Sequence, residues 1–211
     1  MTEIKICGMT NAADAMNAAQ CGADALGFIF YQKSPRYILP EAARKIIDKL
    51  PRDVCKVGVF VNHEAKVIKE IMEFCGLDFI QLHGDESPQY CREFPKSRLI
   101  KAISKQASHF SDYPVSAILI DTSHPELYGG TGKKSDWDLA VAVKEHCPLI
   151  LSGGLNLGNI EDALRVVSPD AVDINSGVEL SPGKKDPEKV RKIIEIVKKT
   201  GSMTKHTVFK K

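Results

Sequence analysis

The sequence LILSGGLN, residues 149–156, joins an apolar run of strand length to Ser152 and a pair of glycines, and AVDINSG, residues 171–177, repeats this order. Both runs are rich in Leu, Ile, Val or Ala, which suits strands that are buried on both faces of a parallel sheet. Small polar residues and glycine follow where the backbone has to turn, and a charged amphipathic segment comes next. Two such units in succession predict a repeated strand–loop–helix architecture.

The same alternation extends along the rest of the chain. Strands are predicted at residues 3–7, 25–30, 56–61, 78–82, 99–103, 117–120, 149–151 and 171–174. Helices are predicted at residues 11–20, 40–50, 64–74, 87–93, 137–145, 157–167 and 187–198, with a weak helical pattern at 106–112. Several of these helices have recognisable starts, with Asn11, Asp136 and Asp186 as N-caps and with Pro40 and Pro187 in first turns.

Eight strand–helix units in about 200 residues favour a closed (β/α)₈ TIM barrel that forms one catalytic domain over residues 1–200. An open, doubly wound sheet is the alternative, because periodicity does not show whether the last strand pairs with the first. Residues 201–211, GSMTKHTVFKK, are polar and basic and have no helical or strand pattern. They are predicted to form a C-terminal tail.

Composition limits the partners and the compartment. Lys and Arg number 29 against 27 for Asp and Glu, and the net charge of +2 argues against a nucleic-acid or anionic-membrane partner. The six cysteines are scattered, without CxxC or a Cys/His cluster, so reduced thiols are expected. Glu3 and Lys5 interrupt the N-terminus where a signal peptide needs an apolar run, and no apolar run of membrane-spanning length follows. A soluble, cytoplasmic protein is expected.

Three chemically different side chains end predicted strands with the same orientation. Side chains alternate along a strand, so Cys7, His83 and Asp121 are predicted to point into the lumen while their apolar neighbours face the helices. In a barrel of this type the C-terminal ends of the strands carry the active site. The alternative for each residue taken singly is that a polar side chain only marks the end of its strand.

Anion-binding groups are predicted at the same end. Gly153 and Gly154 follow the seventh strand, and Asn175-Ser176-Gly177 follows the eighth, so that backbone N–H groups of both loops can surround a phosphate. Arg36 lies in the loop after the second strand, where it can bind a carboxylate or phosphate or can simply be a surface charge. The glycine-rich segment 128–133 is predicted to be either a lid or a solvated loop.

This set of groups indicates proton transfer. The sequence has no cluster with metal-ligand spacing, no GxGxxG opening the first helix and no P-loop, so a metal site, a dinucleotide and a nucleoside triphosphate are not expected. A Cys/Asp pair across a cavity suits an isomerase, in which one group removes a proton and the other donates one. For Cys7 to remove a proton, its pKa has to be lowered, and Lys5 is the candidate for that influence. For Asp121 to donate a proton, its pKa has to be raised by a partly desolvated site.

The sequence closely resembles the phosphoribosylanthranilate isomerase family over residues 3–198. The resemblance is carried, in order, by KICGMT (5–10), GADALGFIF (22–30), KSPRYI (33–38), VGVFVN (57–62), QLHGDE (81–86), LIDT (119–122), GGTGKKSDW (129–137), LSGGLN (151–156), DINSGVE (173–179) and PGKKD (182–186). It implies a barrel enzyme of tryptophan biosynthesis that converts N-(5-phosphoribosyl)anthranilate to 1-(2-carboxyphenylamino)-1-deoxyribulose 5-phosphate by an Amadori rearrangement. It also implies that the reaction uses no cofactor and no metal.

The resemblance assigns roles to individual residues. It implies that Cys7 is the general base, that Asp121 is the general acid and that Arg36 binds the anthranilate carboxylate. The residues that it implies at the phosphate are Gly153, Gly154, Ser176 and Gly177. His83 and Asp173 match family positions that either contact the substrate or order the end of the barrel.

Other readings remain open on the sequence. Another phosphosugar isomerase, epimerase or aldolase on the same scaffold is the alternative. An aldolase or epimerase would need a Schiff-base lysine or a metal site, and Lys5 and Lys101 are the strand lysines that could serve. A non-catalytic phosphate-binding barrel would have no need of both Cys7 and Asp121. The partner is expected to be a small phosphosugar. A monomer and a homodimer are both compatible with the sequence, and activity on the related histidine-pathway aminoaldose is also left open.

Overall fold

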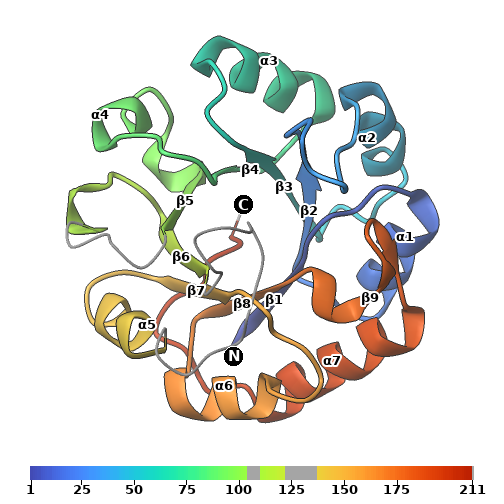
Figure 1. The fold of residues 1–211 in the computed structure, drawn as a ribbon, viewed down its shortest axis with the longest axis vertical. Coiled ribbons are helices and arrows are strands. Elements are labelled where there is room, and N and C mark those ends of the chain that lie inside the picture. Colours follow the sequence, from blue (N-terminus) through green and yellow to red (C-terminus); the bar gives the residue numbers. More distant parts are fainter. Residues whose placement is uncertain (104–109, 122–136, 211) are drawn as a thin grey trace.

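Eight parallel strands close into a barrel in the computed structural model, which describes residues 1–103, 110–121 and 137–210 (Figure 1). The strands are β1 (Glu3–Ile6), β2 (Ala25–Ile29), β3 (Cys55–Phe60), β4 (Phe79–Leu82), β5 (Leu99–Ile103), β6 (Ala117–Asp121), β7 (Leu149–Ser152) and β8 (Ala171–Ile174). The last strand pairs with the first, in a parallel register that runs from Glu3 opposite Ala171 to Ile6 opposite Ile174. The predicted barrel is therefore confirmed, and the open-sheet alternative is wrong.

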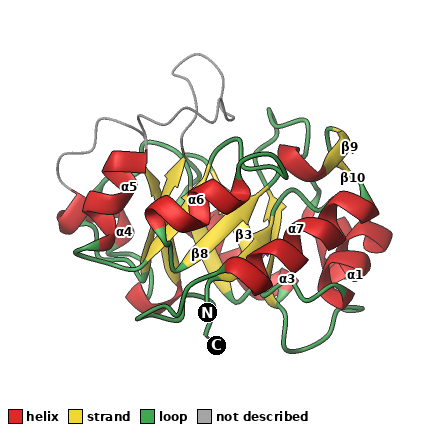
Figure 2. Cartoon of the chain, turned by 90° about the horizontal axis from the view of Figure 1, so that it is seen from below, coloured by secondary structure: helices red, strands yellow, loops and turns green. Residues whose placement is uncertain are grey.

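Helices follow the strands and surround the barrel (Figure 2). They are α1 (Ala12–Gln20), α2 (Pro40–Ile47), α3 (Ala65–Cys75), α4 (Pro88–Cys91), α5 (Trp137–Lys144), α6 (Ile160–Val167) and α7 (Pro187–Thr200), with 3₁₀ turns η1 (Lys96–Arg98), η2 (Phe110–Asp112) and η4 (Ser176–Val178). A small hairpin of β9 (Glu179–Ser181) and β10 (Lys184–Lys185) lies between η4 and α7. Of the weak helical pattern predicted at 106–112, only η2 falls within the described residues.

The predicted helix starts agree with the structure where it describes them. The side chain of Asn11 accepts a hydrogen bond from Asp14 N–H, and Asp186 accepts from Glu188 N–H and Lys189 N–H. Pro40 and Pro187 lie in first turns, where no backbone donor is needed. The third predicted cap, Asp136, lies outside the described residues.

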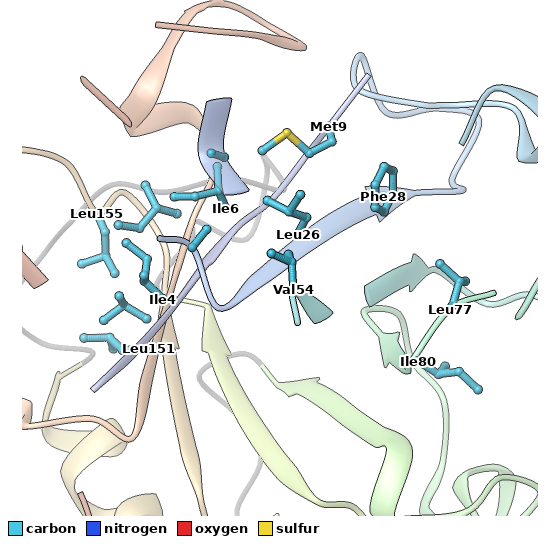
Figure 3. Packing of buried hydrophobic residues seen from close by; sticks show 14 of the residues in the cluster. Ile4, Ile6, Met9, Leu26, Phe28, Val54, Leu77, Ile80, Leu151 and Leu155 are labelled. Atoms are coloured by element: carbon cyan, nitrogen blue, oxygen red, sulfur yellow. The ribbon is translucent and has the colours of Figure 1, made fainter. Parts of the chain in front are cut away.

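Alternate side chains of each strand enter two separate apolar cores. Ile4, Ile6, Leu26, Ile80 and Leu151 face outward and pack with the helices (Figure 3). The intervening residues fill the lumen; they include Val57, Phe79, Ile100, Leu119 and Ile150. This is the alternation that the sequence predicts, and it means that a polar residue with lumen parity at the end of a strand reaches the mouth of the barrel.

The C-terminal tail ends inside the opposite mouth. Residues 201–210 form no helix or strand, but Val208 and Phe209 are only 5% and 6% exposed and belong to the lumen core. The Phe209 ring meets Phe79 edge to face with 6.2 Å between centroids, and the Glu3 carboxylate accepts the backbone N–H groups of both tail residues. Both chain ends thus lie on the side where the strands begin (Figure 2).

All six cysteines are free thiols, as predicted. Cys7, Cys55, Cys75 and Cys91 are buried, whereas Cys21 and Cys147 are partly exposed. Among the helices in the described ranges, none is long and apolar enough to cross a membrane.

Candidate active site

A cavity of about 770 Å³ opens where the strands end. Every predicted site residue except Gly177 lines it; these residues are Cys7, Arg36, His83, Asp121, Gly153, Gly154, Asp173 and Ser176. Among the described residues, the cavity is lined from seven strands or the loops that follow them: β1, β2, β3, β4, β6, β7 and β8. The predicted glycine-rich segment 128–133 lies outside the described residues.

Cys7 directly follows β1 and lies above an ion pair in the lumen. Lys5, two residues earlier and completely buried, has its Nζ 2.7 Å from Asp173 Oδ2 on β8. Gly27 on β2 gives the thiol its space, because a Cβ at this position would lie 2.6 Å from Cys7 Sγ. Asp173 Oδ1 is buried and has no hydrogen-bond partner among the described residues, although Asp173 lines the cavity.

Opposing influences act on the thiol. Burial raises the pKa of Cys7, and the charge of Asp173 acts in the same direction. The pKa is lowered by the charge and hydrogen bond of Lys5 and by the charge of Lys185. The net direction of the pKa is upward. The predicted influence of Lys5 has the right sign, but the expectation of a lowered pKa for the Cys7 thiol is wrong, because desolvation outweighs the nearby positive charge.

A row of polar contacts leads from β4 to Asp121 at the end of β6. Gln81 Nε2 lies 2.9 Å from His83 Nδ1, and His83 Nε2 lies 3.3 Å from Asp121 Oδ2. An amide nitrogen only donates, so His83 Nδ1 is the acceptor in this contact, and Nε2 is the ring nitrogen that faces the Asp121 carboxylate. Gln81 is 1% exposed, and it thereby fixes the orientation of the imidazole from inside the barrel.

Arg36 is bound by residues that sequence reasoning missed. Its guanidinium pairs with Glu179 at the start of β9, and Glu179 in turn contacts the buried Lys185 of β10. Both residues stand in motifs that carry the resemblance, DINSGVE and PGKKD, but nothing local in those motifs indicates a partner 143 residues away. Gly8, after Cys7, packs against the Arg36 side chain: a Cβ there would lie 2.9 Å from Arg36 Cδ.

The two predicted anion loops adopt turns that depend on glycine and asparagine. Gly153 and Gly154 have φ of 88° and 63°, and the Gly154 carbonyl accepts from the side-chain amides of Asn156 and Asn159 at 2.9 and 3.0 Å. Helix α6 begins at Ile160, three residues after the predicted start at residue 157, and it ends at Val167 as predicted. The turn η4 follows β8 and includes Ser176, which lines the cavity.

Gly177 explains how closely these loops approach each other. A Cβ at this position would lie 1.9 Å from the Leu155 carbonyl oxygen, so only glycine allows the loop after β8 to pack against the loop after β7. Gly177 itself does not line the cavity.

An apolar wall completes the cavity. Ile29, Tyr31 and Val59 pack with Cys7 on the side of β2 and β3 and line the cavity beside Arg36. A flat apolar group with an acidic substituent suits this combination of wall and guanidinium. Within the described residues, no group of three or more His, Cys, Asp or Glu side chains is arranged to hold a metal ion.

Known proteins similar to the chain agree in sequence and in fold. The family model for N-(5'-phosphoribosyl)anthranilate (PRA) isomerase matches residues 4–196. The N-(5'-phosphoribosyl)anthranilate isomerase of Syntrophus aciditrophicus is 53% identical over 203 residues, which cover 94% of this chain and 88% of that protein.

Solved structures extend this similarity to three dimensions. The crystal structure of phosphoribosyl anthranilate isomerase from Thermotoga maritima has a TM-score of 0.87 and 43% identity, with coverage of 94% of this chain and 100% of that one. A second isomerase structure, in complex with reduced 1-(o-carboxyphenylamino)-1-deoxyribulose 5-phosphate, has a TM-score of 0.83, 40% identity and the same coverage. The chain therefore belongs to the N-(5'-phosphoribosyl)anthranilate isomerase family, whose members convert N-(5-phosphoribosyl)anthranilate to 1-(2-carboxyphenylamino)-1-deoxyribulose 5-phosphate in tryptophan biosynthesis.

Proposed function

We propose that the chain catalyses this isomerisation with Cys7 as general base and Asp121 as general acid. The observation that carries the proposal is that both side chains line one cavity from strands that are not neighbours: β1 and β6 are separated by β7 and β8 around the barrel. A substrate in the cavity can therefore be reached by two proton-transfer groups from different sides.

The proposed sequence of steps conserves every atom. Asp121 donates a proton to the ribose ring oxygen, the bond from that oxygen to C1 breaks, and the anthranilate nitrogen forms an iminium with C1. The thiolate of Cys7 then removes the proton from C2, and the electron pair of that bond moves into the iminium to give an enolamine. Tautomerisation moves the proton of the C2 hydroxyl to C1 and yields the ketose. Cys7 then loses its proton to water, and Asp121 takes one from water, so that both groups return to their starting forms. The iminium takes up the electron pair, so the proposed steps draw on no other electron sink.

The ionisation of Cys7 is coupled to this sequence. Burial holds the pKa of Cys7 above its usual value. The iminium places a positive charge beside the thiol, and a nearby positive charge favours the thiolate. The base is thus strengthened at the step that uses it, with Lys5 supplying a permanent contribution of the same sign.

Substrate binding is assigned to the rest of the rim. Arg36 binds the anthranilate carboxylate, and the loops at Gly153–Gly154 and Ser176–Gly177 bind the phosphate, with Gly177 acting through backbone contacts between the loops. His83 orients Asp121, and Asp173 Oδ1 accepts a hydrogen bond from a substrate hydroxyl. The unpartnered state of that buried oxygen supports the last assignment, because a buried acceptor is normally satisfied.

The aldolase alternative has little support. Neither strand lysine lines the cavity: Lys5 is paired with Asp173, and Lys101 Nζ lies 2.9 Å from Glu86 Oε2 and 2.7 Å from the Gly84 carbonyl oxygen. A Schiff-base lysine has to present an uncharged amine to the substrate, which these ion pairs oppose.

The proposal is tested by replacing each proton-transfer group singly. Cys7→Ala and Asp121→Asn are each expected to lower kcat by ~10² or more, measured by the loss of anthranilate-type fluorescence of freshly made substrate. Cys21→Ala and Asp53→Asn, a partly exposed thiol and an exposed carboxylate away from the cavity, are matched controls. Turnover within a few-fold of the parent in either test variant would remove that residue from the mechanism.

A further inference from the structure

The guanidinium of Arg36 is fixed along one edge by Glu179. Arg36 Nε lies 2.8 and 3.1 Å from the two carboxylate oxygens, and Nη2 lies 2.6 Å from Oε2. The Glu179 side chain is 5% exposed and does not line the cavity, whereas Arg36 is 18% exposed and does. A bidentate contact of this kind sets both the plane and the direction of the guanidinium.

Glu179 is in turn fixed from behind by Lys185, which is 1% exposed. Lys185 Nζ lies 3.0 Å from Glu179 Oε1, 3.0 Å from Asn175 Oδ1 and 3.1 Å from the Asn175 carbonyl oxygen, so its three N–H groups have three acceptors. Burial alone would raise the pKa of Glu179, but the hydrogen bonds and charges of Arg36 and Lys185 lower it. The carboxylate is therefore ionised and held on two sides.

The charges of the cluster formed by Arg36, Glu179 and Lys185 leave one positive charge for a ligand. Arg36 and Lys185 contribute two positive charges and Glu179 one negative charge. If Arg36 and Glu179 were alone, the pair would be neutral and would attract an anion only weakly. Lys185 cancels the charge of Glu179, so that Glu179 orients Arg36 without neutralising it.

The donors of Arg36 also divide between the cluster and the cavity. A guanidinium has five N–H groups, and Glu179 occupies the edge formed by Nε and Nη2. In the described part of the chain Nη1 has no hydrogen-bond partner, so the edge formed by Nη1 and Nη2 is the one left for a second carboxylate.

We propose that Glu179 is a positioning residue for substrate recognition, which turns the free edge of Arg36 toward the anthranilate carboxylate while Lys185 compensates its charge. The inference rests on the proposed contact between Arg36 and that carboxylate. It predicts that Glu179 affects only the part of the binding energy that depends on the carboxylate.

The test compares two stable ligands that differ in one group. The probes are 1-(2-carboxyphenylamino)-1-deoxyribitol 5-phosphate and 1-phenylamino-1-deoxyribitol 5-phosphate, with affinities measured by titration calorimetry on the parent, Glu179→Gln, Arg36→Met and the double variant. Glu179→Gln is expected to reduce the preference for the carboxylated ligand about tenfold. The double variant is expected to match Arg36→Met, because Glu179 acts only through Arg36.

Each outcome has a defined meaning. If Arg36→Met retains the full preference, the proposed contact of Arg36 is wrong. If Arg36→Met loses the preference for the carboxylated ligand and Glu179→Gln keeps it, only the role of Glu179 is overturned. The same holds if the double variant loses more of this preference than Arg36→Met does. Tighter binding of the carboxylated ligand by Glu179→Gln would show that Glu179 competes for Arg36 and would also overturn the proposal.

Two further variants separate positioning from folding. Glu179→Asp keeps the charge but shortens the side chain by one methylene, so it is expected to show the same selective loss even if Glu179→Gln folds poorly. Glu188→Gln, on the surface of α7 and paired with Arg191, is the matched control and is expected to leave both affinities unchanged. Steady-state kinetics should show a raised KM for Glu179→Gln with kcat changed less than about threefold.

Discussion

The tail that enters the barrel predicts a stability effect without a catalytic one. Phe209 is 6% exposed and meets Phe79 edge to face, and replacing such a residue by alanine in a core costs about 3–5 kcal/mol. Phe209 lies near the chain end and outside any strand, so the tail can detach locally, and the lower value of about 3 kcal/mol is expected for Phe209→Ala. For a chain of this length that loss lowers Tm by ~6–12 °C.

Catalysis should be unaffected because the tail and the cavity lie at opposite ends of the barrel. Glu3, which binds the tail, and Cys7, at the cavity, are about 13 Å apart along β1. Thermal unfolding followed by circular dichroism gives Tm, and kcat/KM at 25 °C is expected to stay within twofold of the parent. Met203→Ala, at a tail residue that is 86% exposed, is the matched control. Equal Tm values for the two variants would refute the idea that the tail is part of the core.

Three other outcomes follow from the site. Burial raises the pKa of Cys7, so the thiol is mainly protonated at pH 7, and kcat/KM should increase between pH 7 and 9 as thiolate forms; a flat profile over this interval would contradict a thiolate base. Gly8→Ala places a Cβ 2.9 Å from Arg36 Cδ at a φ of 76°, so it should raise KM. Gly76→Ala is the control: its φ of 67° causes similar backbone strain, but open space surrounds the new Cβ, so KM should be unchanged. Lys5→Met breaks a buried ion pair and should cost about 3–5 kcal/mol of stability in thermal unfolding. Because Lys5 lowers the pKa of Cys7, its loss should also move the rise of kcat/KM to higher pH. An unshifted pH profile would show that Lys5 does not act on the thiol.

Features with a short sequence period were predictable. The strands alternate with a period of two, so the lumen orientation of Cys7, His83 and Asp121 followed from their apolar neighbours. The caps at Asn11 and Asp186 followed from the preference of these side chains for unpaired N–H groups. The roles of the site residues, the boundary after residue 200 and the choice between monomer and homodimer stay predictions.

Features that depend on distant partners were not predictable. Arg36 and Glu179 are separated by 143 residues, and no pattern in either segment indicates the other. Val208 and Phe209 are two apolar residues in a polar stretch, which is too short a signal to predict burial. Helix α6 starts late because Asn156 Oδ1 accepts from Gly158 N–H, a local turn that competes with the first helical turn.

The start of β1 lies beside the end of α7. Thr2 N–H donates to the Ser202 carbonyl oxygen at 3.1 Å, so the first strand starts beside the point where the last helix has ended. A short linker between the two ends, combined with new ends in a surface loop such as that at Asp53, would preserve every strand pair of the barrel. In such a permuted chain residues 203–210 would cross the floor of the barrel as an internal loop, anchored at both ends.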